Sequence, residues 1–336
     1  MTKQYKIAIV NSNSFGKVYT QHIERLKKIG SVERFMFDQQ ISGRELAKKL
    51  QGFNIIIASV TPNFTKEFFE NKDELLLLSR HGIGFNNVDV QAAKNHETLV
   101  TLVPEDVERD AVAENALANL MSVVRRIVPS YAANKAGNWE TRANFQGTNL
   151  TGKTFGVIGC GNIGSRMAEI FNQGFHGRVL ITDPNPEPHA PKNWFKDNHP
   201  ERVGLETLLE SSDFITLNAS LNETSRGILN DQTLSRVKKG VYITNAARGA
   251  LIDEKAMLEA IEDGRVRGYA TDTTIEEPTS ANHPFFKNDR VIVTPHTSAY
   301  TDDCLFGMGE KCVSDVENFV NHKPLVREIT TTLTLA

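Results

Sequence analysis

The chain has 336 residues, of which 40% are hydrophobic and 24% are charged, proportions that are ordinary for a globular protein and exclude a disordered or fibrous chain. This length accommodates two domains, each with its own core. The formal net charge of −3 and the lack of a Lys- or Arg-rich run argue against nucleic acid and anionic membranes as partners.

The chain begins with a short polar stretch that passes directly into a strand-like segment. This beginning lacks the apolar core and cleavage site of a signal peptide, and no apolar run approaches the roughly 20 residues that cross a bilayer. Cys160, Cys304 and Cys312 are odd in number and have no metal-ligand spacing. We therefore expect reduced structural thiols, no metal site, no membrane contact and a cytoplasmic location.

Short apolar runs rich in Val and Ile alternate with longer segments of helical period. This alternation predicts an α/β fold with parallel sheets that helices cover on both faces. The first series of runs comprises residues 6–11, 54–60, 74–79 and 98–104. The second comprises residues 155–159, 178–183, 213–218, 241–245, 268–272 and 291–294. The six runs of the second series match a doubly wound dinucleotide-binding sheet, and the first series predicts a separate, smaller domain.

A domain boundary is expected near Pro104, where a long helical pattern begins. Residues 105–127 carry two adjacent apolar stripes, a wider face than a helix needs to cover one sheet. We interpret this segment as an inter-domain helix; a helix that also takes part in a dimer contact is the alternative. Residues 130–150 are mostly polar, with Trp139 and Phe145 among their few large apolar groups, and are expected to form an excursion or arm.

A glycine-rich segment follows the first strand of the second series. It places Gly159, Gly161 and Gly164 in the G-x-G-x-x-G pattern at the start of a predicted helix. The first glycine permits a tight turn, the second lets the backbone approach a pyrophosphate, and the third lets the helix pack on the strand. Asn162 and Ile163 begin that helix, whose N-terminal N–H groups suit a phosphate.

The next predicted strand ends at Asp183, roughly 20 residues after Gly164, where a nucleotide-binding fold carries an acidic residue. A carboxylate there bonds the ribose hydroxyls of NAD and repels the 2′-phosphate of NADP. Pro184 and Asn185 follow with no Arg beside them, so the sequence favours NAD. A simple turn at Asp183 is the alternative interpretation.

Polar side chains follow three later strands. Arg248 stands just past one strand, Asp272 ends the next with Glu277 shortly after it, and His296 stands just past the last. Because ligands bind outside the carboxyl ends of the strands of an open parallel sheet, we expect these groups beside the cofactor. Taken singly, each has a structural explanation, as a surface ion-pair partner, a solvated turn residue or a capped loop residue. Their order along the chain favours the functional interpretation.

The ordered set of motifs resembles that of the D-isomer-specific 2-hydroxyacid dehydrogenase family. It comprises G-x-G-x-x-G, Asn-Ala-Ala-Arg-Gly at residues 245–249, Asp-x4-Glu-Pro at 272–278 and Thr-Pro-His at 294–296, with further likeness at 80–89, 112–116 and 213–217. The resemblance implies NAD-dependent interconversion of a small 2-oxo acid with its D-2-hydroxy acid. It also implies two doubly wound parallel-sheet domains: a Rossmann cofactor domain at 105–299, and a smaller flavodoxin-like substrate domain at 1–104 plus 300–336.

The resemblance also implies roles for individual residues. Reduction adds a hydride to C2 and a proton to the carbonyl oxygen, and a histidine, with an ordinary pKa near 6.5, suits that proton transfer. His296 is the expected acid/base, Glu277 the carboxylate that orients its ring, and Arg248 the clamp on the substrate. Substrate binding is expected at Gly82, Ile83, Gly84, Arg248 and Tyr300. Cofactor binding is expected at Gly159, Gly161, Asn162, Ile163, Gly164, Asp183, Asn218, Ala246 and Asp272.

The chain departs from the family pattern at two positions. Asn218 stands where the family often has a histidine, and Thr274 stands where it often has an apolar or aromatic residue. The second departure leaves the choice of Glu277 over Glu276 resting on spacing and on the proline that follows. His81, beside the expected substrate loop, is a further candidate for substrate contact; the other histidines are expected to be structural or at the surface.

Three alternative functions accompany this interpretation. A phosphoglycerate-type dehydrogenase would need extra basic groups, and the expected substrate loop has only Arg80 and His81 nearby. A formate dehydrogenase would carry glutamine in place of Glu277. A non-catalytic, NAD-sensing partner protein on the same fold could retain the same residues, so turnover separates it from an enzyme. Family members are usually homodimers through the cofactor domain, and the same assembly is expected here.

Overall fold

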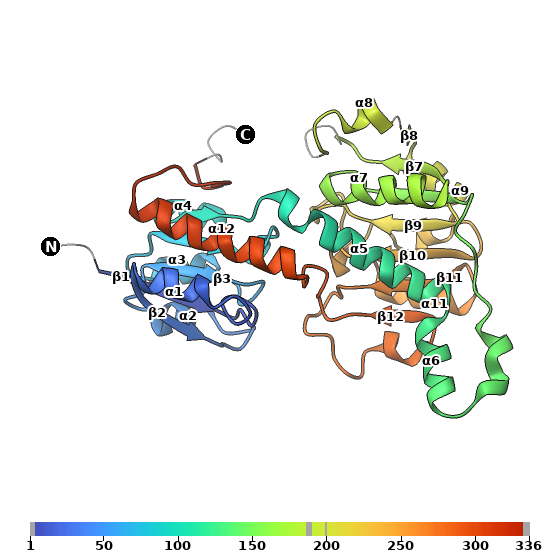
Figure 1. The fold of residues 1–336 in the computed structure, drawn as a ribbon, viewed down its shortest axis with the longest axis horizontal. Coiled ribbons are helices and arrows are strands. Elements are labelled where there is room, and N and C mark those ends of the chain that lie inside the picture. The colour runs from blue at the N-terminus through green and yellow to red at the C-terminus, as the bar shows by residue number, and fades with distance from the viewer. Residues whose placement is uncertain (1–3, 186–189, 199, 332–336) are drawn as a thin grey trace. The chain divides into compact units, whose positions relative to one another are not determined.

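The computed structural model describes residues 4–185, 190–198 and 200–331. The chain divides into two units (Figure 1): unit 1 comprises the residues up to Glu108 and from Tyr300 onward, and unit 2 comprises Arg109–Ala299. The division falls after Glu108 rather than near Pro104, because the first turn of the long helix belongs to unit 1. There Arg327 donates to the Glu105 carboxylate at 2.5 Å.

Unit 1 contains a five-stranded parallel sheet in the order β2-β1-β3-β4-β5, the order of a flavodoxin-like fold. Alternate residues of the strands face opposite sides, so that Ile7 and Ile9 pack on one face while Ala8 and Val10 pack on the other. The strands are β1 (Tyr5–Val10), β2 (Gly30–Phe35), β3 (Ile55–Ala58), β4 (Leu77–Arg80) and β5 (Leu99–Thr101). The first face is covered by α1 (Gln21–Lys27) and α12 (Asp302–Val320), the second by α2 (Gly43–Lys49), α3 (Lys66–Asn71) and α4 (Val90–Asn95).

Unit 2 contains a seven-stranded parallel sheet in the order β12-β11-β10-β9-β6-β7-β8. This is the doubly wound Rossmann order with one additional strand, β12, and the chain reverses direction across the sheet between β6 and β9. The strands are β6 (Thr154–Ile158), β7 (Arg178–Thr182), β8 (Glu201–Arg202), β9 (Phe214–Leu217), β10 (Val241–Asn245), β11 (Val266–Thr271) and β12 (Val291–Val293). The α/β class and the two parallel sheets expected from the apolar runs are confirmed.

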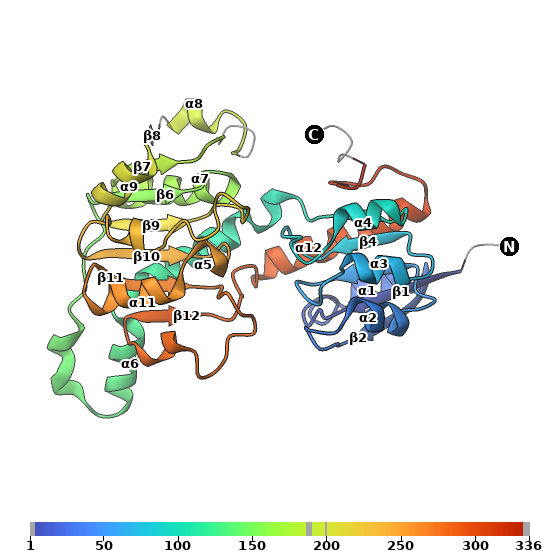
Figure 2. The same cartoon turned by 180° about the vertical axis from the view of Figure 1, so that it is seen from behind.

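Helices cover both faces of the unit 2 sheet, as the two opposite views of Figures 1 and 2 show. One face packs against α5 (Glu105–Val124) and α7 (Asn162–Glu169), through Leu120 and Met167 among others. The other packs against α9 (Leu205–Ser211), α10 (Asp231–Leu234) and α11 (Glu254–Glu262), through Leu208, Leu234 and Met257. The continuous apolar runs of the strands are explained by this burial on both sides.

The helix predicted over residues 105–127 is shorter in the structure. Helix α5 ends at Val124, and Arg126 adopts a left-handed conformation with φ +55° before α6 (Ile127–Lys135) begins. The predicted arm contains the end of α6 and a 3-10 helix, η1 (Trp139–Phe145), neither of which has a buried residue. In Figure 1 this segment projects away from the unit 2 sheet.

Two strands were not expected from the sequence. Strand β2 has an alternating, largely polar pattern that includes Glu33 and Arg34, so it forms no apolar run. Strand β8 is only two residues long, and both of them are exposed. Across the described residues, no helix combines the length and apolar character needed to cross a bilayer.

Candidate active site

The glycine-rich turn between β6 and α7 has the close contacts that its sequence predicts. Gly159 has φ +85°, and a Cβ there would lie 2.5 Å from the Ala219 backbone nitrogen. A Cβ on Gly164 would lie 2.0 Å from the Gly159 carbonyl oxygen, so any side chain would push α7 off the turn. Gly161 precedes α7, whose first residues are Asn162 and Ile163. The first N–H groups of this helix can hold an anion.

Asp183 follows β7 and lies beside the glycine turn. Its Oδ2 accepts from the Cys160 N–H at 2.7 Å, and its Oδ1 accepts from the Asn185 N–H at 2.9 Å. These bonds fix a carboxylate next to the residues that would hold a pyrophosphate. Burial raises the pKa of the Cys160 thiol to about 12, so the thiol is inert and packs as a small apolar group.

Arg248 stands in a turn that follows β10. The Asn245 side chain closes this turn, donating from Nδ2 to the Arg248 carbonyl at 2.9 Å and accepting from the Ala247 N–H at 3.0 Å. A Cβ on Gly249 would lie 2.1 Å from the carbonyl carbon of Thr274, so the Arg248 turn packs backbone to backbone against the segment that leads to Glu277. Side chains are excluded where the two segments meet.

The catalytic pair predicted from the sequence is brought together by the structure. His296 Nδ1 lies 2.8 Å from Glu277 Oε2, and the two side chains are 32% and 31% exposed. A carboxylate on Nδ1 favours the tautomer with its proton there and leaves Nε2 for exchange with a substrate oxygen. The neighbouring Glu276 instead has its backbone carbonyl bonded by the Thr274 hydroxyl at 2.8 Å. The geometry therefore favours Glu277 over Glu276 as the partner.

The remaining cofactor residues expected in unit 2 also follow the carboxyl ends of strands. Asn218 follows β9, where its N–H donates to the Ile158 carbonyl at 2.8 Å and its Nδ2 donates to Thr216 at 3.2 Å. Ala246 follows β10 and is partly exposed. Asp272 follows β11, where five donors from Thr294, Thr297 and Ser298 converge on its carboxylate. Contact of these residues with a cofactor stays a prediction.

The expected substrate loop belongs to unit 1. Its Gly82 has φ +154°, and the Gly84 carbonyl accepts two bonds from the Arg80 guanidinium, at 2.9 Å and 2.6 Å. The Ile83 N–H, expected to hold a substrate carboxylate, donates at 3.0 Å to the carboxylate of Glu108. The Ile83 amide therefore already binds a carboxylate, that of Glu108. Tyr300 begins the second part of unit 1 and is 54% exposed.

His81 and Arg80 are buried beside this loop. His81 is 7% exposed, and its ring meets that of Phe15 edge-on with the centroids 5.4 Å apart. Burial, assisted by nearby cations, lowers the pKa of His81 to about 3, so its ring is neutral near pH 7. The Arg80 guanidinium also donates to the Ala58 carbonyl at 2.8 Å. Both side chains are thus engaged within the fold of unit 1.

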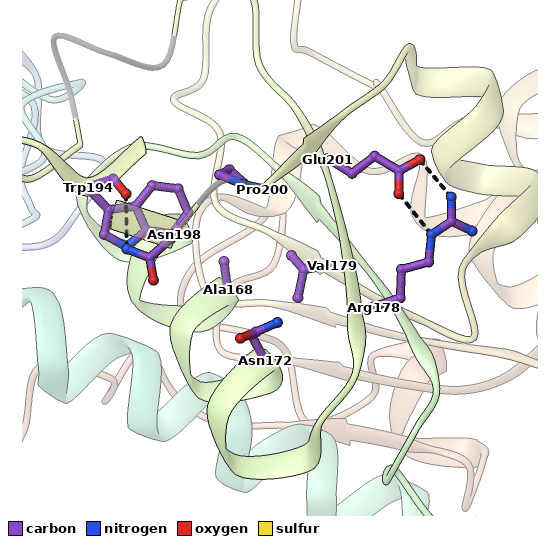
Figure 3. Close-up of a pocket in the computed structure, with 8 residues that line it drawn as sticks. All are labelled: Ala168, Asn172, Arg178, Val179, Trp194, Asn198, Pro200 and Glu201. Atoms are coloured by element: carbon purple, nitrogen blue, oxygen red, sulfur yellow. Dashed lines mark hydrogen bonds and ion pairs between the residues drawn. The ribbon is translucent and has the colours of Figure 1, made fainter. Parts of the chain in front are cut away.

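A cavity of about 230 Å³ lies at the start of β7, whereas Asp183 follows the end of that strand. Figure 3 shows the side chains that line this cavity. Arg178, the first residue of β7, lies there in an ion pair with Glu201 at 2.6 Å. The cavity is lined by Ala168, Asn172, Arg178, Val179, Trp194, Asn198, Pro200 and Glu201. None of the residues predicted to bind cofactor or substrate is among them. In the described ranges, no cluster of three or more His, Cys, Asp or Glu side chains could hold a metal ion.

Several residues at the site were missed by the sequence analysis. Glu108 reaches the Ile83 amide, and Asn115 and Asn119 of α5 reach the loop that carries His296. Two asparagines four residues apart on an otherwise apolar helix face were a usable signal, because a buried amide needs hydrogen-bond partners. Glu108 carried no such signal, since acidic residues are ordinary in the first turn of a helix.

Comparison with known proteins agrees with the fold and the motifs. Residues 117–298 match the family described as "D-isomer specific 2-hydroxyacid dehydrogenase, NAD binding domain". The chain is 33% identical over 275 residues to hydroxypyruvate reductase of Thermotoga maritima, covering 81% of this chain and 86% of that protein. It is 33% identical over 287 residues to D-3-phosphoglycerate dehydrogenase 2 of Arabidopsis thaliana, covering 85% of this chain but 44% of that protein.

The chain spans about half the length of the curated phosphoglycerate dehydrogenases that it matches. Among solved structures, D-lactate dehydrogenase of Escherichia coli superposes with a TM-score of 0.80 at 29% identity, covering 96% of this chain and 99% of that one. The family match extends over more than half of the 336 residues and includes the glycine turn, Arg248, Glu277 and His296. The chain belongs to the D-isomer-specific 2-hydroxyacid dehydrogenase family and carries its NAD-binding domain.

Proposed function

We propose that this protein reduces a small, unphosphorylated 2-oxo acid to the D-2-hydroxy acid with NADH, and catalyses the reverse oxidation. The observation that carries the proposal is the 2.8 Å contact between His296 and Glu277, beyond the carboxyl ends of the sheet that bears the glycine turn. The bound cofactor supplies the hydride, for which the Gly159–Gly164 turn and the Asp183 carboxylate form a fitting cradle.

The residues of unit 2 divide the remaining chemistry among them. His296 gives a proton from Nε2 to the carbonyl oxygen as the hydride arrives at C2, and takes it back in the oxidation direction. Glu277 orients the ring through its contact with Nδ1. Arg248 offers a fork of donors to the substrate carboxylate and the adjacent oxygen. In unit 1, the Gly82–Gly84 amides and Tyr300 are proposed substrate contacts.

An unphosphorylated substrate is favoured by the state of the two basic residues near the substrate loop. Arg80 is 1% exposed and its guanidinium bonds the carbonyls of Ala58 and Gly84. His81 is buried and neutral near pH 7. Neither therefore offers a positive charge to a phosphate. A phosphoglycerate-type activity is the second candidate, because several of the relatives bear that name.

We also propose a homodimer assembled through the arm of unit 2. Large apolar side chains are more than half exposed in the arm, at Tyr131 and Trp139, and just before it, at Ile127 and Val128. The Arg142 guanidinium lies over the Trp139 ring, 5.7 Å from its centroid. Clustered apolar surface of this kind marks an interface with another protein, and a second copy of the chain agrees with the family resemblance. A Tyr131→Ser, Trp139→Ser double variant is expected to sediment as a monomer while the wild type sediments as a dimer. A cytoplasmic location stays a prediction from the three unpaired cysteines.

The test is NADH oxidation by the purified protein with a panel of 2-oxo acids, from glyoxylate and pyruvate through branched and aromatic acids to phosphohydroxypyruvate. We expect turnover with one unphosphorylated acid, and loss of turnover in His296→Gln with NADH binding retained. Preference for phosphohydroxypyruvate would support the second candidate. Tight NADH binding without turnover on any acid would overturn the proposal and favour an NAD-sensing protein.

A further inference from the structure

A ring of polar side chains lies behind the loop that carries His296. Asp272 Oδ1 accepts from the Thr294 hydroxyl at 2.5 Å, and the Thr294 oxygen accepts from Asn119 Nδ2 at 3.0 Å. The same Nδ2 donates to Asn115 Oδ1 at 3.0 Å. The Ser298 hydroxyl completes the ring of contacts: it donates its one proton to Asp272 Oδ2 across the shorter contact, and its oxygen lies 3.0 Å from Asn115 Oδ1.

The backbone of the same loop binds the same carboxylate. The Thr297 N–H donates to Asp272 Oδ1 at 2.9 Å, and the Ser298 N–H donates to Oδ2 at 2.7 Å. A carboxylate has about four acceptor positions. Here the Thr294 and Ser298 hydroxyls and the Thr297 and Ser298 amides fill them, and the Thr297 hydroxyl lies farther away, 3.4 Å from Oδ1. Asp272 is 1% exposed, so water does not compete for these bonds. The carboxylate is therefore committed to residues on both sides of His296.

His296 itself has a backbone conformation that needs such support. Its φ is +52°, in the left-handed region that non-glycine residues rarely adopt, at a cost on the order of 1 kcal/mol. Its N–H lies 3.0 Å from the carbonyls of both Asp272 and Thr294. The loop is thus held in a conformation that it would not adopt alone, with the His296 ring at 2.8 Å from Glu277.

We propose that Asp272, braced by Asn115 and Asn119 of α5, is a positioning device for His296. The ring links the general acid to the long helix α5, of which the first residues belong to unit 1 and the rest to unit 2. Asn119 is 7% exposed, and its amide has both Thr294 and Asn115 as partners. This role extends the proposed function and rests on it, since it presumes that His296 transfers the proton.

Two variants test the ring at different points. Asn119→Leu keeps the shape of the side chain and suits a helix, but removes the bonds to Thr294 and Asn115. Asp272→Asn replaces one carboxylate oxygen by an NH₂ group, which donates and does not accept. That group would face two existing donors: either the N–H and hydroxyl of Ser298, or the Thr297 N–H and the Thr294 hydroxyl. Asn172→Leu is the matched control, because Asn172 is exposed in unit 2 and its bond to the Gly177 carbonyl is long, at 3.5 Å.

We expect kcat to fall about 10-fold in Asn119→Leu and about 100-fold in Asp272→Asn, in proportion to the hydrogen bonds lost. In Asn119→Leu the melting temperature and the dissociation constant for NADH should stay close to those of the control. Hydrogen exchange gives a second measurement that needs no turnover: the Thr297 and Ser298 amides should exchange faster in both variants and remain protected in the control.

The two proposals fail in distinguishable ways. If the wild type turns over no acid, the proposed function fails, and amide exchange still reports whether the ring holds the loop. If both variants keep wild-type kcat and wild-type exchange at Thr297 and Ser298, the ring does not position His296. If kcat falls only together with the melting temperature, while exchange at these amides is unchanged, the residues stabilise unit 2 in general and the positioning role is overturned.

Discussion

His296 and Glu277 meet at 2.8 Å although they come from loops that follow different strands, β12 and β11. The His296 loop is held by the Asp272 carboxylate, and the segment that carries Glu277 is bonded by the Thr274 hydroxyl. Neither loop depends on the partner side chain, so each partner can be removed without dismantling the loop that bears the other. His296 and Glu277 can therefore each be substituted to test its role separately.

Glu277→Gln should lower the rate of reduction. The His296 Nδ1 lies 2.8 Å from the Glu277 carboxylate, and an amide in its place makes a weaker hydrogen bond that orients the ring less firmly. We expect kcat/KM near neutral pH to fall between about 10-fold and 100-fold, measured as NADH oxidation. Glu276→Gln is the control; an equal loss in that variant would contradict the assignment of Glu277.

Asp183→Ser should relax the choice between NADH and NADPH. The carboxylate beside the glycine turn repels a 2′-phosphate and bonds a free ribose, so its loss should weaken NADH about 10-fold and improve NADPH. Dissociation constants from fluorescence titration give the ratio directly. Asp197→Asn, at an exposed position of the same unit, should leave both constants unchanged. A wild-type protein that already prefers NADPH would refute the role given to Asp183.

Glu108→Ala should lower KM for the 2-oxo acid. The Glu108 carboxylate holds the Ile83 N–H at 3.0 Å, and a substrate carboxylate that uses this amide has to displace it. Removing a competing hydrogen bond of about 1 kcal/mol predicts a KM lower by about 5-fold, with kcat little changed. Asp106→Ala alters an exposed acidic residue in the same helical turn and controls for net charge. A raised KM in Glu108→Ala would show that Glu108 helps to bind substrate instead.

Unit 1 should lose stability in mild acid because of His81. Burial lowers its folded pKa to about 3, while the unfolded chain has the ordinary value near 6.5, so the unfolded state binds more protons between these limits. Stability is fully present above pH 6.5 and falls as the pH falls through that window, by about 2 kcal/mol between pH 7 and 5. Urea unfolding, monitored by circular dichroism at pH 7 and pH 5, measures the free energy of unfolding. The decrease of this free energy between the two pH values should be smaller in His81→Phe than in the wild type. The exposed His322→Gln should behave as the wild type.

The elements that a local sequence pattern marks were predictable from the sequence. Apolar runs located most strands, because a strand buried on both faces must be apolar along its whole length. Strand β2 was not predicted, because it is largely polar and includes charged side chains. It therefore has no apolar run that distinguishes it from a loop. The boundary between α5 and α6 was not predicted, because a short break at the left-handed Arg126 separates the two helices.

At the site, the sequence predicted residues whose type and spacing are typical of one function. It did not predict contacts between residues far apart in the chain. The glycine turn, His296 and Glu277 followed from spacing and family resemblance. The carboxylate of Asp272 was expected near a cofactor, yet its bonding to Ser298 depends on how β11 and the last loop pack, which no local pattern records. Contact between Asp272 and a nicotinamide stays a prediction, and it would require one of the donors now bound to this carboxylate to leave.

The order of the two units along the chain has a consequence during protein synthesis. Unit 2 is one uninterrupted stretch, whereas unit 1 is built from both parts of the chain that flank it. Cys312, Val313 and Val316 of α12 pack against the β1 face that carries Ile7 and Ile9. A ribosome that has translated as far as Ala299 has therefore synthesised every residue of unit 2, while that face of β1 still lacks its covering helix. The β1 segment is made before α12, and until α12 is made its apolar side chains have no partner on that face.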